Sequence, residues 1–393
     1  MRRPGHIGRA FLFTSFVASP LTECGREKYT PSSDAAGPGL DPHPLGDETM
    51  PAFRSFRIHP LLLGLLGGLA LGCKPQPAPE TKVPAGTEGA APLHPLTVKP
   101  LNDHLLYFYD GRDSTGKRFM KEWNWKDDAA MKLGVGTYVI HQGDRALVYD
   151  TFTAPEQAEW AREYLEKMGI KHFTVVYSHW HLDHVGGNAA YPDADVISTA
   201  ATRDSLAAEK SAIEAGTAWG PPPIKPLILP TITFADRLDL YVGDIRVEMR
   251  RINIHSKDTN VLYLPAEKIL LCGDALEDVL TYMVEPGGLP EHVKNLGTMR
   301  GWDVAAIYPN HGDPNVIMKG GYTKTLIDAT SDYITKMVTR SHDKNYLDGT
   351  MEDYVGPSLA KGWVHMFEPY RDVHKQNLKL VSDYYKGKPL PKM

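Results

Sequence analysis

A run of three histidines and one aspartate within six residues constrains the fold of this chain more than any other feature. The letters SHWHLDHVGGN follow directly on an apolar stretch, residues 173–177, that predicts a buried strand. Imidazole and carboxylate groups are ligands that suit zinc and similar first-row metals. His179 and His181 are alternate residues of an extended segment, so their side chains point the same way and can bind one ion. Asp183 and His184 follow after the backbone turns and can face a neighbouring ion. The run therefore predicts a metal site at the end of a strand.

Strand and helix patterns alternate through the rest of the globular part. Strands are predicted at residues 135–141, 145–150, 173–177, 195–198, 246–254, 261–264, 269–271 and 304–308, and helices at 153–168, 199–215 and 290–301. This alternation predicts an α/β class with two mixed sheets packed together and covered by helices. From residue 321 onward the pattern is mainly helical.

The histidine run resembles the HxHxDH signature of the metallo-β-lactamase superfamily, and two further motifs follow in that family's order. The stretch from His255 to Asp274 resembles the hairpin that joins two of the family's metal ligands. The letters YPNHG, which contain His311, are similar to its last ligand motif. The similarity covers roughly residues 132–312. It implies an αββα sandwich, with the metal site at the edge between the sheets.

The resemblance also implies a ligand set of seven residues for two zinc ions, although other first-row divalent metals suit the same groups. It assigns His179, His181 and His255 to the first ion, Asp183, His184 and His311 to the second, and Asp274 to both. Two cations about 3.5–4 Å apart lower the pKa of a shared water to about 7, which supplies hydroxide at neutral pH. Asp183 is expected to be the catalytic residue that orients this nucleophile and passes its proton to the leaving group.

The expected function is a binuclear zinc-dependent hydrolase in which the bridging hydroxide attacks the carbonyl of a small ester, thioester, lactone or amide. The alternatives are a periplasmic metallo-β-lactamase and a glyoxalase II-like thioesterase. An iron-containing redox protein of the same superfamily would be expected to have carboxylate-richer ligands and a flavin domain.

Four further residues are candidates for the surroundings of the metals. Asp150 is expected to be a buried partner behind a ligand. Trp219, in a proline-rich loop, and Tyr282 are expected to wall an apolar pocket. Glu277 stands where the β-lactamases that this hairpin resembles carry a lysine, and Asp278 follows it. These two carboxylates are expected to repel an anionic substrate, which argues against β-lactams.

A second strong signal lies near the N-terminus. Two arginines precede an apolar run, residues 61–72, that has the length of a signal-peptide core, and the letters LALGC ending in Cys73 resemble a bacterial lipobox. The sequence therefore predicts acylation of Cys73, with an uncleaved signal anchor as the alternative. Lys74 after the cysteine favours the outer membrane, so the expected location is the bacterial cell envelope, lipid-anchored and facing the periplasm.

The predicted organisation of the chain has five segments. They are a gene-model extension or disordered stretch at 1–49, a signal peptide at 50–72, a flexible Pro/Gly/Ala/Thr tether at 73–98, the hydrolase domain at 99–317, and a helical C-terminal extension at 318–393. The net charge of −5 and the pI of about 6.3 do not suggest a nucleic-acid partner. The expected partners are a small-molecule substrate and a membrane, and the oligomeric state is left open.

Overall fold

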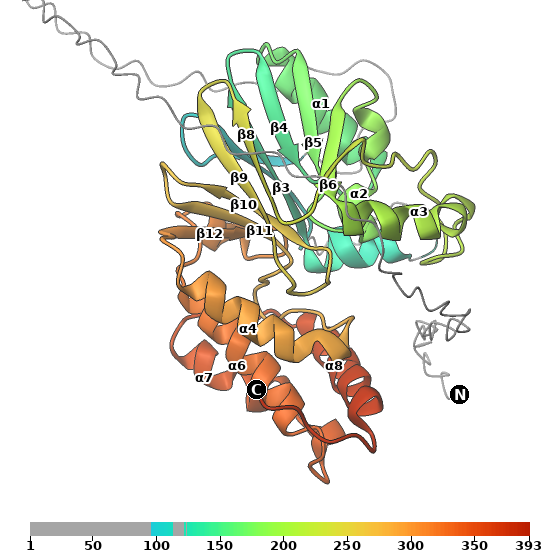
Figure 1. Ribbon diagram of the computed structural model, residues 1–393, viewed down its shortest axis with the longest axis vertical. Coiled ribbons are helices and arrows are strands. Elements are labelled where there is room, and N and C mark those ends of the chain that lie inside the picture. The colour runs from blue at the N-terminus through green and yellow to red at the C-terminus, as the bar shows by residue number, and fades with distance from the viewer. Residues whose placement is uncertain (1–95, 113–121, 123) are drawn as a thin grey trace, which may run out of the picture. The chain divides into compact units, whose positions relative to one another are not determined.

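The computed structural model describes residues 96–112, 122 and 124–393 (Figure 1). The chain divides into two units after Ala85, and all of the described residues belong to the second. The predicted segments 1–49 and 50–72, together with Cys73, lie outside the described residues. Within the described part of the chain, no helix has the length and apolar character needed to span a membrane.

Seven strands form the first sheet, and they lie side by side in chain order. They are β1 (Thr97–Pro100), β2 (Leu105–Asp110), β3 (Val135–Gln142), β4 (Arg145–Tyr149), β5 (His172–Val176), β6 (Asp195–Thr199) and β7 (Ile232–Phe234). The first four strands are antiparallel neighbours, whereas β4 to β7 run parallel. Parallel neighbours need a crossover, and α1 (Pro155–Lys167) and α3 (Ala200–Ala215) provide two of them.

Five strands form the second sheet, in the order β12-β11-β10-β9-β8. They are β8 (Arg237–Val242), β9 (Ile245–Arg251), β10 (Asn260–Leu264), β11 (Ile269–Gly273) and β12 (Ala306–Pro309). The first four are antiparallel, and β12 joins β11 in parallel after the crossover helix α4 (Leu289–Arg300). Figure 1 shows the two sheets against each other, with α1 and α3 beside the first sheet.

Alternation along β2 explains how the first sheet is buried on both faces. Leu105 and Tyr107 join the core that the first sheet shares with the second, whereas Leu106 and Phe108 join the core beneath α1. Burying each such side chain contributes about 1.5–3 kcal/mol relative to leaving it exposed. Two separate apolar layers therefore hold the sandwich together, and the predicted αββα fold is confirmed.

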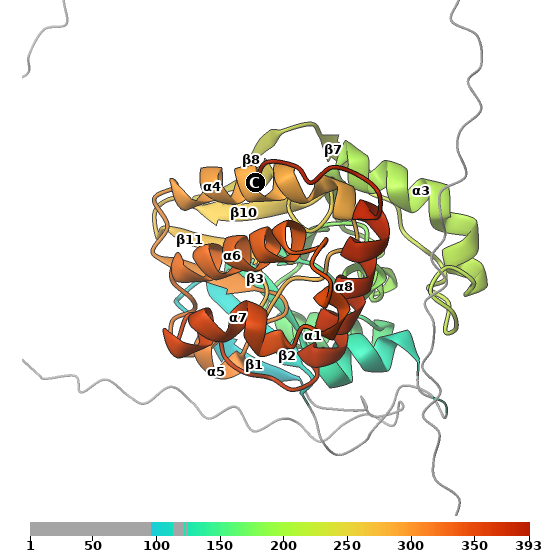
Figure 2. The same cartoon turned by 90° about the horizontal axis from the view of Figure 1, so that it is seen from below.

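The C-terminal region is helical, as predicted, and packs on the α4 side of the second sheet (Figure 2). It contains α6 (Thr325–Thr339), α7 (Met351–Ala360) and α8 (Tyr370–Tyr385). The shorter helical turns of the described chain include α2 (Leu182–Val185), α5 (Pro314–Ile317), η1 (Asp127–Leu133), η2 (Asn188–Ala190), η3 (Pro286–Gly288) and η4 (Tyr346–Asp348).

Two contacts cross the predicted segment boundaries. Strand β1 begins at Thr97, inside the stretch predicted as tether, and pairs with β2. Tyr322, from the predicted C-terminal extension, exchanges two backbone hydrogen bonds of 2.8 and 2.9 Å with Ile307 of β12. The C-terminal region is therefore continuous with the edge of the second sheet.

Candidate metal centre

The histidine run occupies the connection between β5 and α2, at the end of a buried strand. His179 is fully buried, and His181 is the extended residue directly before α2. Asp183 and His184 lie within this single helical turn. The two glycines that follow let the chain pass close to the β4–α1 connection, because a Cβ at Gly186 or Gly187 would collide with a backbone carbonyl there. The local sequence thus presents four ligand-type side chains from one compact segment.

Three residues from the second half of the sandwich complete the cluster: Asp274 and His311 lie at strand ends, and His255 lies in a connecting loop. His255 lies between β9 and β10, Asp274 directly follows β11, and His311 follows β12 after one residue. His255 has a φ of 67°, which for a residue other than glycine costs on the order of 1–3 kcal/mol. Such a conformation persists where the surrounding structure fixes it, which agrees with a functional placement of this side chain.

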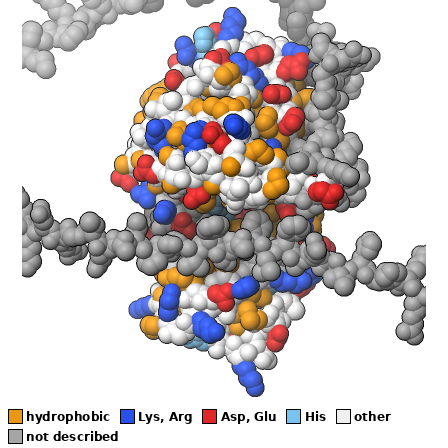
Figure 3. All heavy atoms as spheres, turned by 90° about the vertical axis from the view of Figure 1, so that its right-hand side faces the viewer, with side chains coloured by type: hydrophobic (Ala, Val, Ile, Leu, Met, Phe, Trp, Pro, Cys, Tyr) orange, Lys and Arg blue, Asp and Glu red, His pale blue; other side chains and the backbone are white. Residues whose placement is uncertain are grey.

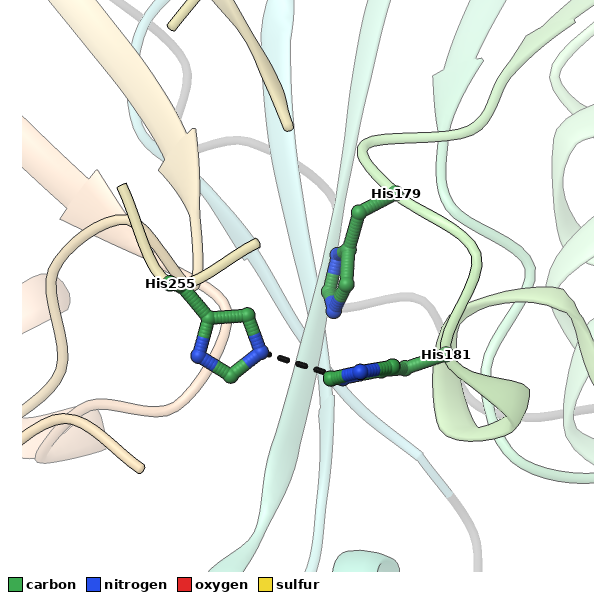
Figure 4. Close-up of side chains that lie close together, drawn as sticks. All are labelled: His179, His181 and His255. Carbon is green, nitrogen blue, oxygen red and sulfur yellow. Dashed lines mark hydrogen bonds between the residues drawn. The ribbon is translucent and has the colours of Figure 1, made fainter. Parts of the chain in front are cut away.

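Three imidazoles from the two sheets converge in the first group (Figure 4). His255 Nε2 lies 3.0 Å from His181 Nδ1, and the His179 and His181 rings are 4.5 Å apart. The second group contains His184, Asp183 and His311, with His311 Nε2 at 3.2 Å from Asp183 Oδ2.

Asp274 reaches both groups with one oxygen. Its Oδ2 lies 3.0 Å from His184 Nε2 and 3.6 Å from His311 Nε2. The same atom lies 3.7 Å from His179 Nε2 and 3.9 Å from His255 Nε2. The structure therefore places all seven predicted ligands together, with Asp274 between the two groups.

The unpaired atoms of this cluster are compatible with a bound cation. His179 Nε2 and Asp274 Oδ1 are buried and have no hydrogen-bond partner. An unpaired buried polar atom lowers the free energy of unfolding by about 1–3 kcal/mol, so buried polar atoms are normally paired with a protein group, water or a ligand. The ligand atoms within each group lie within 4.8 Å of one another. Imidazole and carboxylate groups in this arrangement suit zinc.

Four of the five histidines, all except His181, are also held from behind by an atom that fixes the other ring nitrogen. The contacts are His179 Nδ1 to Ser178 Oγ at 2.9 Å, His184 Nδ1 to Asp150 Oδ2 at 2.8 Å, His255 Nδ1 to the carbonyl of Tyr282 at 3.1 Å, and His311 Nδ1 to the carbonyl of Gly134 at 2.6 Å. A nitrogen that donates to an oxygen leaves the opposite nitrogen free for a metal. These contacts aim Nε2 of all four rings at the centre.

Asp150 thus takes the place behind a ligand that the sequence indicated. Sequence reasoning missed Ser178, Gly134 and Asn310, whose Nδ2 donates to Asp150 Oδ2 at 2.7 Å. Ser178 and Asn310 directly precede the ligands His179 and His311, and this adjacency was the available signal.

The electrostatics of the two groups differ. Burial, together with the neighbouring His184, lowers the pKa of His179 well below its usual value, and burial lowers the pKa of His181 to about 3. Burial also opposes protonation of His311, but the charges of Asp274 and Asp183 outweigh it and raise its pKa to about 9. The first group is therefore neutral and ready to coordinate, whereas the second would release protons when a cation binds.

Glu277 and Asp278 require a correction. Both side chains are buried, and residues of the C-terminal region bind them. Glu277 accepts a hydrogen bond of 3.0 Å from the Tyr370 hydroxyl, and burial followed by the charge of Asp274 raises its pKa to about 8. Asp278 accepts from the hydroxyl of Tyr322 and the backbone of His365, each at 2.7 Å. The correction concerns their surroundings: both carboxylates are held by contacts within the protein, and Glu277 Oε1 lies 3.9 Å from His255 Nδ1. Their expected repulsion of anionic substrates stays a prediction.

Aromatic side chains border the first group. The Trp219 ring lies 5.5 Å from His181, and the Trp125 ring packs edge-on against Trp219 at 5.8 Å. Trp125 Nε1 donates to the carbonyl of Pro222 at 3.1 Å, which fixes the proline-rich loop. Trp219 thus lies beside the first ligand-type group, and Tyr282 contributes its backbone carbonyl to His255. The apolar pocket expected between them stays a prediction.

Comparison with known families agrees with this geometry. The model of the metallo-beta-lactamase superfamily matches residues 132–312, a range that contains all seven ligand-type residues.

Two curated relatives match the chain at low identity, and the first of them covers more of it than the superfamily model does. A linear primary-alkylsulfatase from Pseudomonas sp. is 23% identical over 293 residues, which cover 63% of this chain and 55% of the relative. The alpha subunit of a 2,4-dinitroanisole O-demethylase from Nocardioides sp. is 26% identical over 191 residues, covering 45% of this chain and 53% of the relative. The chain spans about half the length of these relatives.

Solved structures with a similar arrangement include two bacterial proteins. A metallo-beta-lactamase from Pontibacter korlensis matches with a TM-score of 0.45 and 18% identity, and the match covers 60% of this chain and 96% of the lactamase chain. A metallo-beta-lactamase from Hirschia baltica matches with a TM-score of 0.45 and 17% identity, and the match covers 62% of this chain and 98% of the lactamase chain.

Proposed function

Residues 132–312 form a domain of the metallo-β-lactamase superfamily, the domain of a metal-dependent hydrolase, and on this premise we propose that the chain is a binuclear zinc hydrolase of a small substrate. The observation that carries the proposal is the position of Asp274. One carboxylate oxygen lies 3.0 Å from a ligand atom of the second group and 3.7 Å from one of the first. A carboxylate between two imidazole-rich groups is the arrangement expected of a bridging ligand.

All seven residues would hold metal, and Asp183 would in addition carry a proton. His179, His181 and His255 would hold one ion, His184, His311 and Asp183 the other, and Asp274 would hold both. Two bound cations supply Lewis-acid polarisation of the substrate's oxygen and a water of lowered pKa.

Asp183 is suited to orient that water and to carry its proton to the leaving group. Burial raises its pKa, but His184 and His311 outweigh this effect and hold the pKa at about 2, so the group is an acceptor at neutral pH. With 8% of its surface exposed, it is also the most accessible of the seven residues. Both properties suit a proton carrier.

The substrate proposed is an ester, thioester, lactone or amide with an apolar body. Trp219 borders the first ligand group, so an apolar part of the substrate can contact its ring while the scissile group lies at the metals. A second candidate is an alkyl sulfate ester. The relative named an alkylsulfatase favours it, because that similarity extends over more residues than the superfamily domain.

The proposed location rests on sequence alone. The letters LALGC, preceded by two arginines and an apolar core, support a mature chain that is acylated at Cys73 and attached to the bacterial outer membrane. Radiolabelled palmitate should be incorporated into the full-length protein and not into Cys73→Ser. Equal labelling of both would contradict the anchor.

Metal analysis combined with a substrate panel tests the enzymatic proposal. Protein purified without chelators should contain close to two zinc ions per chain and hydrolyse at least one neutral ester, thioester, lactone or alkyl sulfate. Asp274→Ala should keep the fold but lose activity by orders of magnitude. His179→Ala should also lose activity, and His172→Ala is its matched control, because His172 is exposed at the start of β5, the strand that leads to His179. A metal content near zero, or full activity of Asp274→Ala, would refute the proposal.

A further inference from the structure

Asn377 of α8 connects the C-terminal helix to the loop that follows Asp274. Its Oδ1 accepts from the backbone N–H of Met283 at 2.8 Å, and its Nδ2 donates to the carbonyl of Thr281 at 2.9 Å. A further N–H donates to the hydroxyl of Tyr333 at 3.1 Å. Because the Met283 N–H can only donate and the Thr281 carbonyl can only accept, a flipped side chain would set donor against donor and acceptor against acceptor.

Tyr282 stands between the two residues that Asn377 binds. Its N–H donates to Glu277 Oε1 at 3.0 Å, and Glu277 Oε2 accepts from the Tyr370 hydroxyl of the same helix. The peptide units around Tyr282 are therefore fixed by α8 twice, directly through Asn377 and indirectly through Glu277.

The carbonyl of Tyr282 contacts His255 Nδ1 at 3.1 Å. A carbonyl oxygen can only accept, so the proton of a neutral His255 must reside on Nδ1. Nε2 is then unprotonated and faces His181 Nδ1 at 3.0 Å and the first ligand group. The position of the Tyr282 carbonyl thus selects the tautomer that can bind a cation.

We propose that Asn377 is a positioning residue for the first metal-binding group, because it holds the Tyr282 carbonyl where that carbonyl fixes the tautomer of His255. This inference rests on the proposed metal-binding function.

The chemistry of Asn377 separates this role from simple packing. The side chain is fully buried, and a leucine of similar volume would fill the same space without three polar partners. A buried amide is retained at no net cost only when its hydrogen bonds are all made. Here two of the three bonds fall on the residues that flank Tyr282.

Three variants of the full chain test the role. Asn377→Leu removes both loop bonds, and Tyr370→Phe removes only the support of Glu277. Tyr333→Phe is the matched control, because it removes a hydrogen bond from the same amide on the side away from the loop.

The first readout is the ¹⁵N chemical shift of the His255 ring in metal-free protein, assigned by comparison with His255→Gln. The wild type and Tyr333→Phe should show a single tautomer with the proton on Nδ1. Asn377→Leu should show a mixture, and Tyr370→Phe a smaller change in the same direction.

The second readout is titration of the metal-free protein with Co²⁺, followed by visible absorption. Asn377→Leu should bind the first ion about 10–100-fold more weakly, the range found when a partner behind a ligand is removed. Binding at the Asp183–His184–His311 group should stay within about threefold of the wild type.

The two readouts separate this inference from the proposed function. A wild-type protein that binds no Co²⁺ would refute metal binding, whereas the tautomer measurement needs no metal and still decides the positioning role. Wild-type tautomers in Asn377→Leu would overturn the inference. If Asn377→Leu does not fold, Asn377→Asp decides in its place, because it keeps the acceptor for Met283 N–H and loses the donor to the Thr281 carbonyl.

Discussion

Replacing Asp150 with asparagine is expected to weaken cation binding at the Asp183–His184–His311 group about 10–100-fold. Asp150 is fully buried, and three donors converge on it. Its Oδ1 accepts from Ser178 N at 2.6 Å, while Oδ2 accepts from His184 Nδ1 at 2.8 Å and from Asn310 Nδ2 at 2.7 Å. A carboxylate suits this position because both of its oxygens only accept.

Asparagine offers one acceptor and one donor, so either orientation creates a conflict. With its oxygen toward Ser178, the new NH₂ faces the Nδ1 proton of His184. That ring must then move its proton to Nε2, the nitrogen that faces Asp274. The opposite orientation sets two N–H groups against each other at Ser178. Breaking a buried charged contact in this way costs about 3–5 kcal/mol. At about 2–4 °C per kcal/mol for a domain of this size, the melting temperature should fall by about 10 °C.

Zinc affinity can be measured by competition with a chromophoric chelator, and melting by circular dichroism. Asp144→Asn is the matched control, because Asp144 lies in the β3–β4 turn with its side chain half exposed. Zinc affinity of Asp150→Asn within twofold of the wild type would refute the claim that Asp150 fixes the His184 tautomer. A large loss in the control would show that the effect is not specific to the site.

Three further predictions concern pH, substrate and the corrected carboxylate. The pKa of His311 is raised to about 9, so the metal-free folded state keeps a proton that the unfolded state loses above about pH 6.5. The free energy of unfolding in urea should therefore fall between pH 6.5 and 9, by at most about 3 kcal/mol. A flat or rising profile would contradict this protonation of His311. Trp219→Ala should raise KM for apolar esters several-fold with kcat nearly unchanged, and an unchanged KM would remove Trp219 from the substrate site. Glu277→Lys should lower the melting temperature without raising β-lactam hydrolysis, because the side chain lies against Tyr370; increased hydrolysis would support the repulsion hypothesis.

The candidate ligands were predictable chiefly because three of them follow closely on strands that the local sequence identifies. The apolar runs before His179, Asp274 and His311 identify their strands without any knowledge of distant contacts. Strand β2 was not predicted, since a continuous apolar run of five residues does not distinguish a strand from a buried helical segment. Strand β8 was also missed. It lies at the edge of its sheet, and its residues alternate between exposed and half-buried as far as Tyr241, so its alternation of polar and apolar residues was a strand signal that sequence reasoning missed.

The surface gives a physical reason why substrate chemistry was harder to infer than metal chemistry. On the face drawn in Figure 3, acidic and basic side chains are interspersed with hydrophobic ones, as expected for a chain with a small net charge. Single charges read from the sequence then say little about a substrate, because their partners decide whether they face solvent. Asp278 shows this, since its hydrogen bond from His365 spans 87 residues of sequence.

The same long-range contacts give the C-terminal region a function that its helical pattern did not indicate. Tyr370 binds Glu277 and Asn377 binds both neighbours of Tyr282, so one helix reaches the loop behind His255 at two points. An amphipathic helix that only covered a sheet would present apolar side chains there. The polar face that α8 turns toward this loop instead places a distant segment in the support of the metal ligands. Mutations in that segment should therefore alter metal affinity at the first group before they unfold the chain.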